Sequence, residues 1–127
     1  MSVSNDAKVF IVDDDLTLLE YMHDILNDCG IKARIYVRAG DALADAVKEN
    51  PVVVMTDLSL PDINGKELAV RLVENDPKVR VFIMTGFCGE TLEDNAELKG
   101  MGRQVEIIIK PFDIKALVNK MYDILGN

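Results

Sequence analysis

Five short hydrophobic runs recur along the chain, at residues 9–12, 33–37, 52–55, 79–84 and 105–109. The runs are nearly continuous and rich in β-branched residues, whereas a strand with one wet face would alternate apolar and polar residues. Each run therefore predicts a β-strand that is covered on both faces. Strands of this kind are typical of parallel sheets that lie between layers of helices.

Two segments with helical periodicity follow the first two runs. The apolar residues of the first segment recur at intervals of three and four, which predicts one face of a helix: Leu18, Met22, Ile25, Leu26 and Cys29. Gly30 is the expected C-terminal stop of this helix. The second segment has its apolar face on Ala39, Leu43, Ala46 and Val47. It is expected to end before Pro51, because the residue before a proline is disfavoured in a helix.

Three more helices are predicted in the second half of the chain. Asn64, with Glu67 three residues later, resembles a capping box that opens the first of them. Residues 91–98 form the second, which has the weakest apolar face. Asp113 is predicted to cap the last helix, whose apolar face is strong: Ile114, Leu117, Val118, Met121, Tyr122 and Leu125.

Strands and helices thus alternate five times within 127 residues. This alternation predicts repeated βαβ units with right-handed crossovers. The predicted fold is α/β, a single-domain (βα)5 flavodoxin-like fold whose parallel five-stranded sheet has the order 2-1-3-4-5 and helices on both faces. The domain is expected to span residues 1–127 with a core at about 8–125, since a chain of this length builds one core.

Charge and composition exclude several classes of protein. The chain has 14 Lys and Arg residues against 22 Asp and Glu residues, for a net charge of −8. Without a basic cluster it is a poor ligand for nucleic acids and for anionic membrane surfaces. No apolar run is long enough to span a bilayer and no signal peptide is visible, so we expect a cytoplasmic protein. Two cysteines and one histidine are too few for a disulfide scaffold or a zinc site.

Polar residues follow four of the five predicted strands. Asp13 and Asp14 follow the first strand, Asp57 the third, Thr85 the fourth and Lys110 the fifth. The second strand, which the predicted order places at an edge, is followed by no comparable group. Ligands of such sheets bind beyond the carboxyl ends of the strands, so these side chains are expected to converge.

The expected convergence of three carboxylates indicates a cation site. The carboxylates repel one another unless a positive charge neutralises them. Mg²⁺ suits such a cluster because it prefers oxygen ligands and keeps several of its waters, and Lys110 would add a compact positive charge. A carboxylate, a divalent metal ion, a hydroxyl and an amine at one point favour phosphoryl transfer. The acidic loop excludes a dinucleotide-binding fold, which requires a glycine-rich turn there.

Four short motifs lie at these strand ends. They are Val12-Asp13-Asp14-Asp15, the segment from Thr56 to Gly65, Met84-Thr85-Gly86 and Lys110-Pro111-Phe112. In this order and at this spacing they resemble the receiver domain of bacterial two-component response regulators. The resemblance covers the chain from about Lys8 to Leu125.

The resemblance implies a function for the acidic residues. Asp57 would accept a phosphoryl group from the phosphohistidine of a histidine kinase or a phosphotransfer protein. Mg²⁺ is the implied cofactor. Asp14 and Asp57 would bind it through their carboxylates, Ser59 through its backbone carbonyl and Asp13 through a coordinated water.

It also implies roles for residues on the later strands. Thr85 would donate its hydroxyl to a phosphoryl oxygen, and Lys110 would pair with another phosphoryl oxygen. The peptide bond between Lys110 and Pro111 is expected to be cis, as in the family.

As a receiver, the chain would catalyse only its own phosphorylation and dephosphorylation, so it is not expected to be an enzyme in the ordinary sense. Phosphorylation would switch a surface on which a downstream protein docks, near the helix over 91–98, the strand over 105–109 and the last helix. Two forms of regulator fit these motifs. One is a free-standing receiver, and the other is a receiver that is part of a hybrid kinase or a longer regulator.

Two alternatives lie outside the receiver interpretation. Asp13-Asp14-Asp15-Leu16-Thr17 also fits the D-x-D-x-T signature of haloacid-dehalogenase-type phosphohydrolases, with Asp13 as nucleophile and Asp15 as general acid. Against this, no paired carboxylates follow Lys110, and Asp57 would have no function. In the receiver interpretation Asp15 is the N-cap of the first helix. The other alternative is an interaction module that keeps the fold without the chemistry, against which the intact set of site residues argues.

Overall fold

The computed structural model describes residues 7–86, 100 and 104–126. Its sheet has five parallel strands in the order β2-β1-β3-β4-β5, as predicted. The strands are β1 (Val9–Val12), β2 (Ala33–Tyr36), β3 (Val53–Asp57), β4 (Arg80–Thr85) and β5 (Val105–Ile109). Each of these lies within one residue or two of the hydrophobic run that predicted it.

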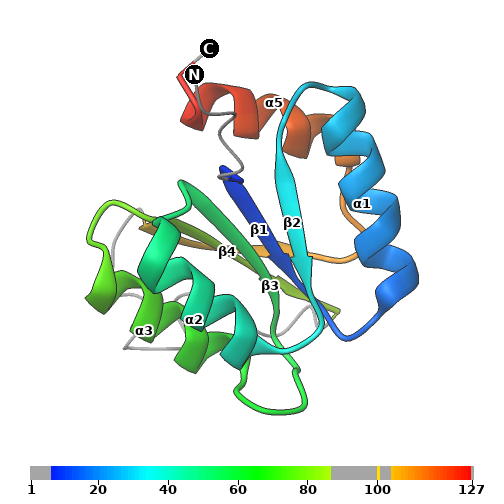
Figure 1. The fold of residues 1–127 in the computed structure, drawn as a ribbon. Coiled ribbons are helices and arrows are strands. Elements are labelled where there is room, and N and C mark those ends of the chain that lie inside the picture. Colours follow the sequence, from blue (N-terminus) through cyan, green and yellow to red (C-terminus); the bar gives the residue numbers. More distant parts are fainter. Residues whose placement is uncertain (1–6, 87–99, 101–103, 127) are drawn as a thin grey trace.

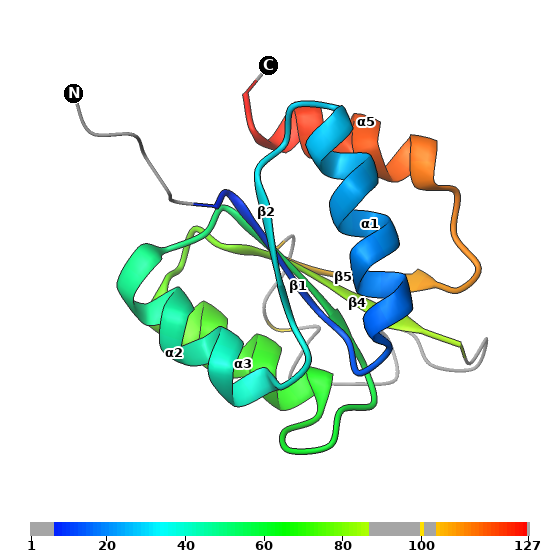
Figure 2. The same ribbon diagram turned by 45° about the vertical axis from the view of Figure 1, so that its right-hand side comes forward.

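Helices cover both faces of the sheet (Figure 1). They are α1 (Leu16–Asp28), α2 (Ala39–Glu49), α3 (Gly65–Asn75) and α5 (Ile114–Ile124). Helices α1 and α5 lie on one face, and α2 and α3 lie side by side on the other, as the turned view also shows (Figure 2). The helix predicted over residues 91–98 lies outside the described residues.

The helices begin and end at the residues that the sequence indicates. The predicted N-caps Asp15, Asn64 and Asp113 are confirmed, since each accepts a hydrogen bond from an amide of the following first turn, at 3.2, 2.9 and 3.0 Å respectively. Gly30 has a φ of 80° and stops α1 in the left-handed conformation that glycine adopts freely. Asn50 ends α2 in the same region, with a φ of 49°.

Two apolar clusters fill the space between the sheet and the helices. Side chains of a strand alternate between the two faces, and β1 shows this most simply. Phe10 and Val12 pack toward α2 and α3, whereas Val9 and Ile11 pack toward α1 and α5. All four are fully buried. The strand that leads directly into Asp13 and Asp14 is therefore held between two cores.

Three expectations about burial were wrong in detail. The buried stripe of α1 begins at Leu19 rather than Leu18, because Leu19, Met22 and Leu26 follow the spacing of three and four more closely. Val47 is 52% exposed, since α2 turns its smaller residues to the core: Ala39, Ala42 and Ala46. Strands β2 and β5 are only partly covered, because each stands at an edge of the sheet with one neighbouring strand.

A polar network joins the edge strand β2 to α2. The Tyr36 hydroxyl donates a hydrogen bond to Asp45 at 2.7 Å, and Arg34 donates both to the Tyr36 oxygen and to Glu49. Burial, and then the bond to Asp45, raise the pKa of Tyr36 above its ordinary value, although Arg34 opposes this. The network therefore fastens the edge strand to the helix that follows it in the chain.

Candidate functional site

The carboxyl ends of the strands bring the predicted site residues together. Asp13 follows β1 directly, Asp57 is the last residue of β3 and Thr85 is the last residue of β4. In the sheet register Asp57 pairs with Met84, so Thr85 stands one position beyond it on the neighbouring strand. Carboxylate oxygens of Asp13, Asp14 and Asp57 all lie within 4.8 Å of one another. The predicted acidic cluster is therefore present.

Lys110, which directly follows the edge strand β5, contacts two members of the cluster. Its Nζ atom lies 3.2 Å from Oδ2 of Asp13 and 3.2 Å from Oδ1 of Asp57. Its backbone amide donates to the carbonyl of Thr85 at 2.7 Å, and the Lys110-Pro111 bond is cis, as expected. One ammonium group thus bridges two carboxylates that are 44 residues apart in the sequence.

The three carboxylates differ in their exposure to solvent. Asp13 is 1% exposed, and its Oδ1 atom accepts a hydrogen bond from the amide of Asp15 at 2.9 Å. Asp57 is half-buried and Asp14 is exposed. Asp14 and Asp57 can therefore offer oxygens directly to a cation in solvent, whereas Asp13 is recessed.

The pKa values of the bridged groups follow from this environment. Burial raises the pKa of the Asp13 carboxyl above its usual range and the charge of Asp57 adds to the rise, while the Asp15 amide and Lys110 oppose it. Burial alone would lower the pKa of the Lys110 ammonium, but the attraction of Asp13 and then of Asp57 outweighs it, so that the net shift is upward. Lys110 therefore stays charged.

This donor set fits a hard divalent cation. Oxygen atoms from three carboxylates converge, and a single lysine does not neutralise all three. Mg²⁺ binds such clusters through one or two carboxylates and retains water at its other positions. Ser59, predicted to contribute its carbonyl, is exposed and stands two residues beyond Asp57 in the loop that follows β3.

The start of that loop is packed closely against α3. The amide of Gly65 donates to the carbonyl of Leu58 at 2.8 Å. A Cβ atom at Gly65 would lie 2.5 Å from the carbonyl oxygen of Asp57 and 3.0 Å from Cα of Leu58, closer than real Cβ contacts. Glycine at this position is therefore what allows α3 to begin directly beside the end of β3.

Sequence reasoning missed Asp62, which lies in the same loop. Its Oδ1 and Oδ2 atoms accept hydrogen bonds from the amides of Ala39 and Gly40, at 3.1 and 2.8 Å. The partners are more than 20 residues apart, so no local motif signals the contact.

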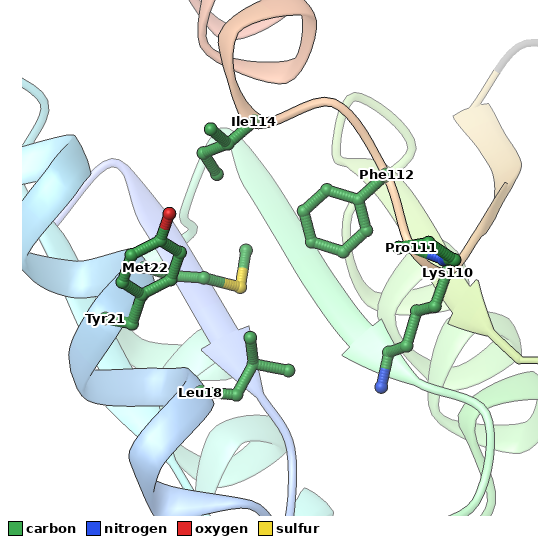
Figure 3. A pocket seen from close by; sticks show the side chains of 7 residues that line it. All are labelled: Leu18, Tyr21, Met22, Lys110, Pro111, Phe112 and Ile114. Atoms are coloured by element: carbon green, nitrogen blue, oxygen red, sulfur yellow. The ribbon is translucent and has the colours of Figure 1, made fainter.

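An apolar groove beside the cluster was also missed. Leu18, Tyr21 and Met22 of α1 line one side of it, and residues that follow β5 line the other: Lys110, Pro111, Phe112 and Ile114 (Figure 3). Tyr21 is 56% exposed although it belongs to this wall. Periodicity could not reveal the groove, because its walls are more than 80 residues apart in the chain.

Comparison with known proteins identifies the family. A family model described as the response regulator receiver domain matches residues 9–122. The chain belongs to this family. Receiver domains are signalling modules that accept phosphoryl groups, and they generally bind Mg²⁺ at an acidic cluster like the one formed by Asp13, Asp14 and Asp57.

Individual relatives agree with this assignment. The receiver is 25% identical to the response regulator receiver protein CpdR of Brucella abortus, over 93% of this chain and 96% of that protein. It is 33% identical to sporulation initiation phosphotransferase F of Bacillus subtilis, over 86% of both chains. A CheY-like receiver domain structure from Methanospirillum hungatei JF-1 superposes with a TM-score of 0.80 at 28% identity, covering 92% of this chain and 91% of that chain.

The family assignment does not support the haloacid-dehalogenase alternative. That alternative needed Asp15 as a general acid, but the Asp15 carboxylate accepts the amide of Leu18 as the N-cap of α1. Within the described part of the receiver, none of the helices combines the length and the apolar character needed to cross a bilayer.

Proposed function

We propose that Asp57 is the phosphoacceptor of this receiver and that its donor is the phosphohistidine of a histidine kinase or a phosphotransfer protein. The observation that carries the proposal is the position of the Lys110 ammonium, 3.2 Å from the Asp57 carboxylate at the open edge of the sheet. Asp57 is half-buried, so one of its oxygens can reach an incoming phosphorus atom. The Bacillus subtilis relative is named a phosphotransferase, in keeping with this chemistry.

The transfer requires one bond to form and one to break. A carboxylate oxygen of Asp57 forms a bond to phosphorus while the bond between phosphorus and the donor histidine nitrogen breaks. The electron pair of that bond stays on the imidazole nitrogen, which takes up a proton. Lys110 stabilises negative charge on the transferring oxygens, and the Thr85 hydroxyl donates to one of them after transfer.

Mg²⁺ is the cofactor that the donor set favours. Asp14 and Asp57 would hold it through carboxylate oxygens, Ser59 through its backbone carbonyl and Asp13 through a water. When bound, the ion supplies positive charge to the phosphoryl oxygens. Asp13 is assigned the indirect role because its side chain is recessed and already engaged by Lys110 and the Asp15 amide.

The apolar groove supports the approach of a protein donor from the α1 side. Lys110 belongs both to the wall of the groove and to the acidic cluster. A partner that seats apolar side chains between Leu18, Tyr21 and Phe112 would therefore hold its histidine close to Asp57. Exposed apolar surface next to a polar site is a common feature of protein docking surfaces.

The output follows from the same assignment. The receiver acts on itself rather than on a separate substrate, in the cytoplasm, with a domain core at about residues 8–125. Its phosphorylated form would present a changed surface to a downstream protein near the segment over 91–98, β5 and α5, without contacting nucleic acid or membrane directly.

Labelling with a small phosphodonor tests the proposal. Acetyl phosphate with Mg²⁺ should phosphorylate the purified protein, and mass spectrometry of its peptides should find the phosphoryl group on Asp57. Asp57→Asn should abolish labelling, as should removal of Mg²⁺ by a chelator. Asp76→Asn, at a half-buried aspartate before β4 and so on the opposite edge of the sheet, should label like the native protein. Label on Asp13, or no label at all, would contradict the proposal.

A further inference from the structure

The N-terminus of α2 is capped by a residue from elsewhere in the chain. Within the described residues, its own N-cap position, Arg38, makes no side-chain hydrogen bond to the helix. The carboxylate of Asp62 instead accepts both Ala39 and Gly40 amides, one on each oxygen. First-turn amides of a helix have no partner within the helix and carry its partial positive charge, so a carboxylate is well suited to them.

Gly40 allows this contact. A Cβ atom at Gly40 would lie 3.2 Å from Oδ2 of Asp62, tighter than an ordinary contact. The hydrogen bond from the Gly40 amide, followed by that from Ala39, lowers the pKa of the Asp62 carboxyl below its usual range. Asp62 is therefore an ionised cap near neutral pH.

Asp62 lies in the middle of the loop that connects the acceptor to α3. Residues 58–64 form this loop, in which Ser59 and Asp62 face solvent. Its apolar residues Leu58, Leu60 and Ile63 are half-buried against the cluster shared by α2 and α3. The hydrogen bond from the Gly65 amide to the Leu58 carbonyl joins the two ends of the loop, and the middle of the loop is tied to α2 by Asp62.

We propose that Asp62 is a positioning residue for the Mg²⁺ site, which it supports by tying the acceptor loop to the N-terminus of α2. The inference rests on the proposed function, in which the Ser59 carbonyl and Asp57 bind the ion. Asp62 touches neither the ion nor the phosphoryl group. It restricts the positions that the Ser59 carbonyl can take, so the loop loses less conformational entropy when the ion binds.

Coupling of this kind is reciprocal. If the tie to α2 strengthens binding of Mg²⁺, then bound Mg²⁺ must strengthen the tie by the same factor. The amides of Ala39 and Gly40 should therefore exchange with solvent more slowly when the ion is bound. A residue that only stabilised the fold would not link these amides to an ion bound at the other end of the loop.

The first test is a Mg²⁺ titration followed by ¹⁵N NMR of the whole chain. Asp62→Ala should weaken binding by about fivefold, the fold-change that corresponds to one typical capping interaction. Asp62→Asn, which keeps one acceptor oxygen, should fall between Asp62→Ala and the native protein. Asp41→Ala is the matched control, since Asp41 carries the same charge on the first turn of α2 and is exposed. It should bind Mg²⁺ like the native protein.

The second test is amide hydrogen exchange with and without Mg²⁺. Exchange at Ala39 and Gly40 should slow by about fivefold in the native protein and remain unchanged in Asp62→Ala. The Lys78 amide is the control, because it also donates to an aspartate carboxylate, that of Asp76, in a turn away from the acceptor loop. Its exchange should not respond to the ion.

The outcomes separate this inference from the proposed function. If the native protein binds Mg²⁺ and Asp57→Asn does not, the metal site stands. Equal Mg²⁺ affinity of Asp62→Ala and Asp41→Ala would then overturn the role of Asp62 alone. If Mg²⁺ does not shift the signals around Asp57 in the native protein, the metal site itself is wrong and the inference falls with it.

Discussion

Lys110 is the counter-charge of Asp13, a carboxylate with almost no access to solvent. The two side chains are 97 residues apart in sequence and 3.2 Å apart in space, between Nζ and Oδ2. A buried carboxylate that loses its positive partner is left uncompensated, and this costs more than an exposed ion pair contributes. The pair therefore has a structural role before any phosphoryl group arrives.

Replacing Lys110 should destabilise the protein through Asp13. We expect Lys110→Met to lower the free energy of unfolding by about 2 kcal/mol, because buried Asp13 then stands unpaired beside Asp57. The double variant with Asp13→Asn should recover about half of this loss. Urea unfolding of the native protein, both single variants and the double variant measures the coupling. Simple additivity of the two single effects would contradict the pairing.

Gly65→Ala should destabilise the protein although it places a better helix former in a helix. Its new Cβ would meet backbone at 2.5 Å, which the backbone must move to relieve, at a cost of about 2 kcal/mol. Gly40→Ala is the comparison, because its Cβ would meet only the end of a side chain at 3.2 Å. We expect Gly40→Ala to remain within about 1 kcal/mol of the native protein in thermal melts. A Gly65→Ala variant as stable as the native protein would show that the close approach is not needed.

Tyr36 should make stability fall at alkaline pH. Its folded pKa is raised, so the unfolded chain loses the phenolic proton first, near pH 10. The stability that it contributes is fully present below that pH and is lost as the pH rises above it, by up to about 1.4 kcal/mol per pH unit. The pKa of Lys110 is also raised in the folded protein, so Lys110 likewise makes stability fall as the pH rises.

Tyr36→Phe isolates the first of these contributions. The variant should be less stable than the native protein at pH 8 by about 1 kcal/mol, because the bond to Asp45 is gone. This difference in the free energy of unfolding should shrink between about pH 9.5 and pH 11, because only the native protein loses the contribution of Tyr36 there. Tyr21→Phe, at an exposed tyrosine, should keep the pH dependence of the native protein. A constant difference between Tyr36→Phe and the native protein across this range would refute the assignment.

Ser59 should favour a long-lived phosphorylated form. It is exposed two residues beyond the acceptor, and its short side chain positions an attacking water less well than an amide or a carboxylate would. We expect Ser59→Gln to shorten the half-life of the acyl phosphate by about fivefold and Ser59→Ala to leave it long. ³¹P NMR after removal of the phosphodonor measures both. Equal half-lives for the three proteins would exclude this role for Ser59.

Local patterns predicted the elements of this fold closely. The runs at β1 and β5 gave the observed bounds, and Asp15, Asn64 and Asp113 were found as caps because capping is decided within four residues. The placement of the acidic residues at one edge followed from the parallel topology. Burial was harder to predict, as Val47 shows, because two neighbouring stripes of α2 are both apolar and only packing chooses between them.

Contacts between distant segments could not be predicted in this way. The bond from the Tyr122 hydroxyl to the carbonyl of Cys29, at 2.6 Å, joins α5 to the end of α1 across 93 residues. The tie between Asp62 and α2 is of the same kind. Neither leaves a periodic signal, since each depends on how two loops or helix ends meet after the sheet has formed.

The positions of the site residues along the chain also set the order in which a growing chain acquires its charges. Asp13 and Asp14 follow β1, and Asp57 is the last residue of β3. These two strands are neighbours in the sheet, and both are complete once residue 57 has been made. Lys110 is synthesised 53 residues later. A partly made chain that pairs β1 with β3 would therefore bring three carboxylates together before Lys110 exists to attract them, so their mutual repulsion opposes early closure of this edge of the sheet.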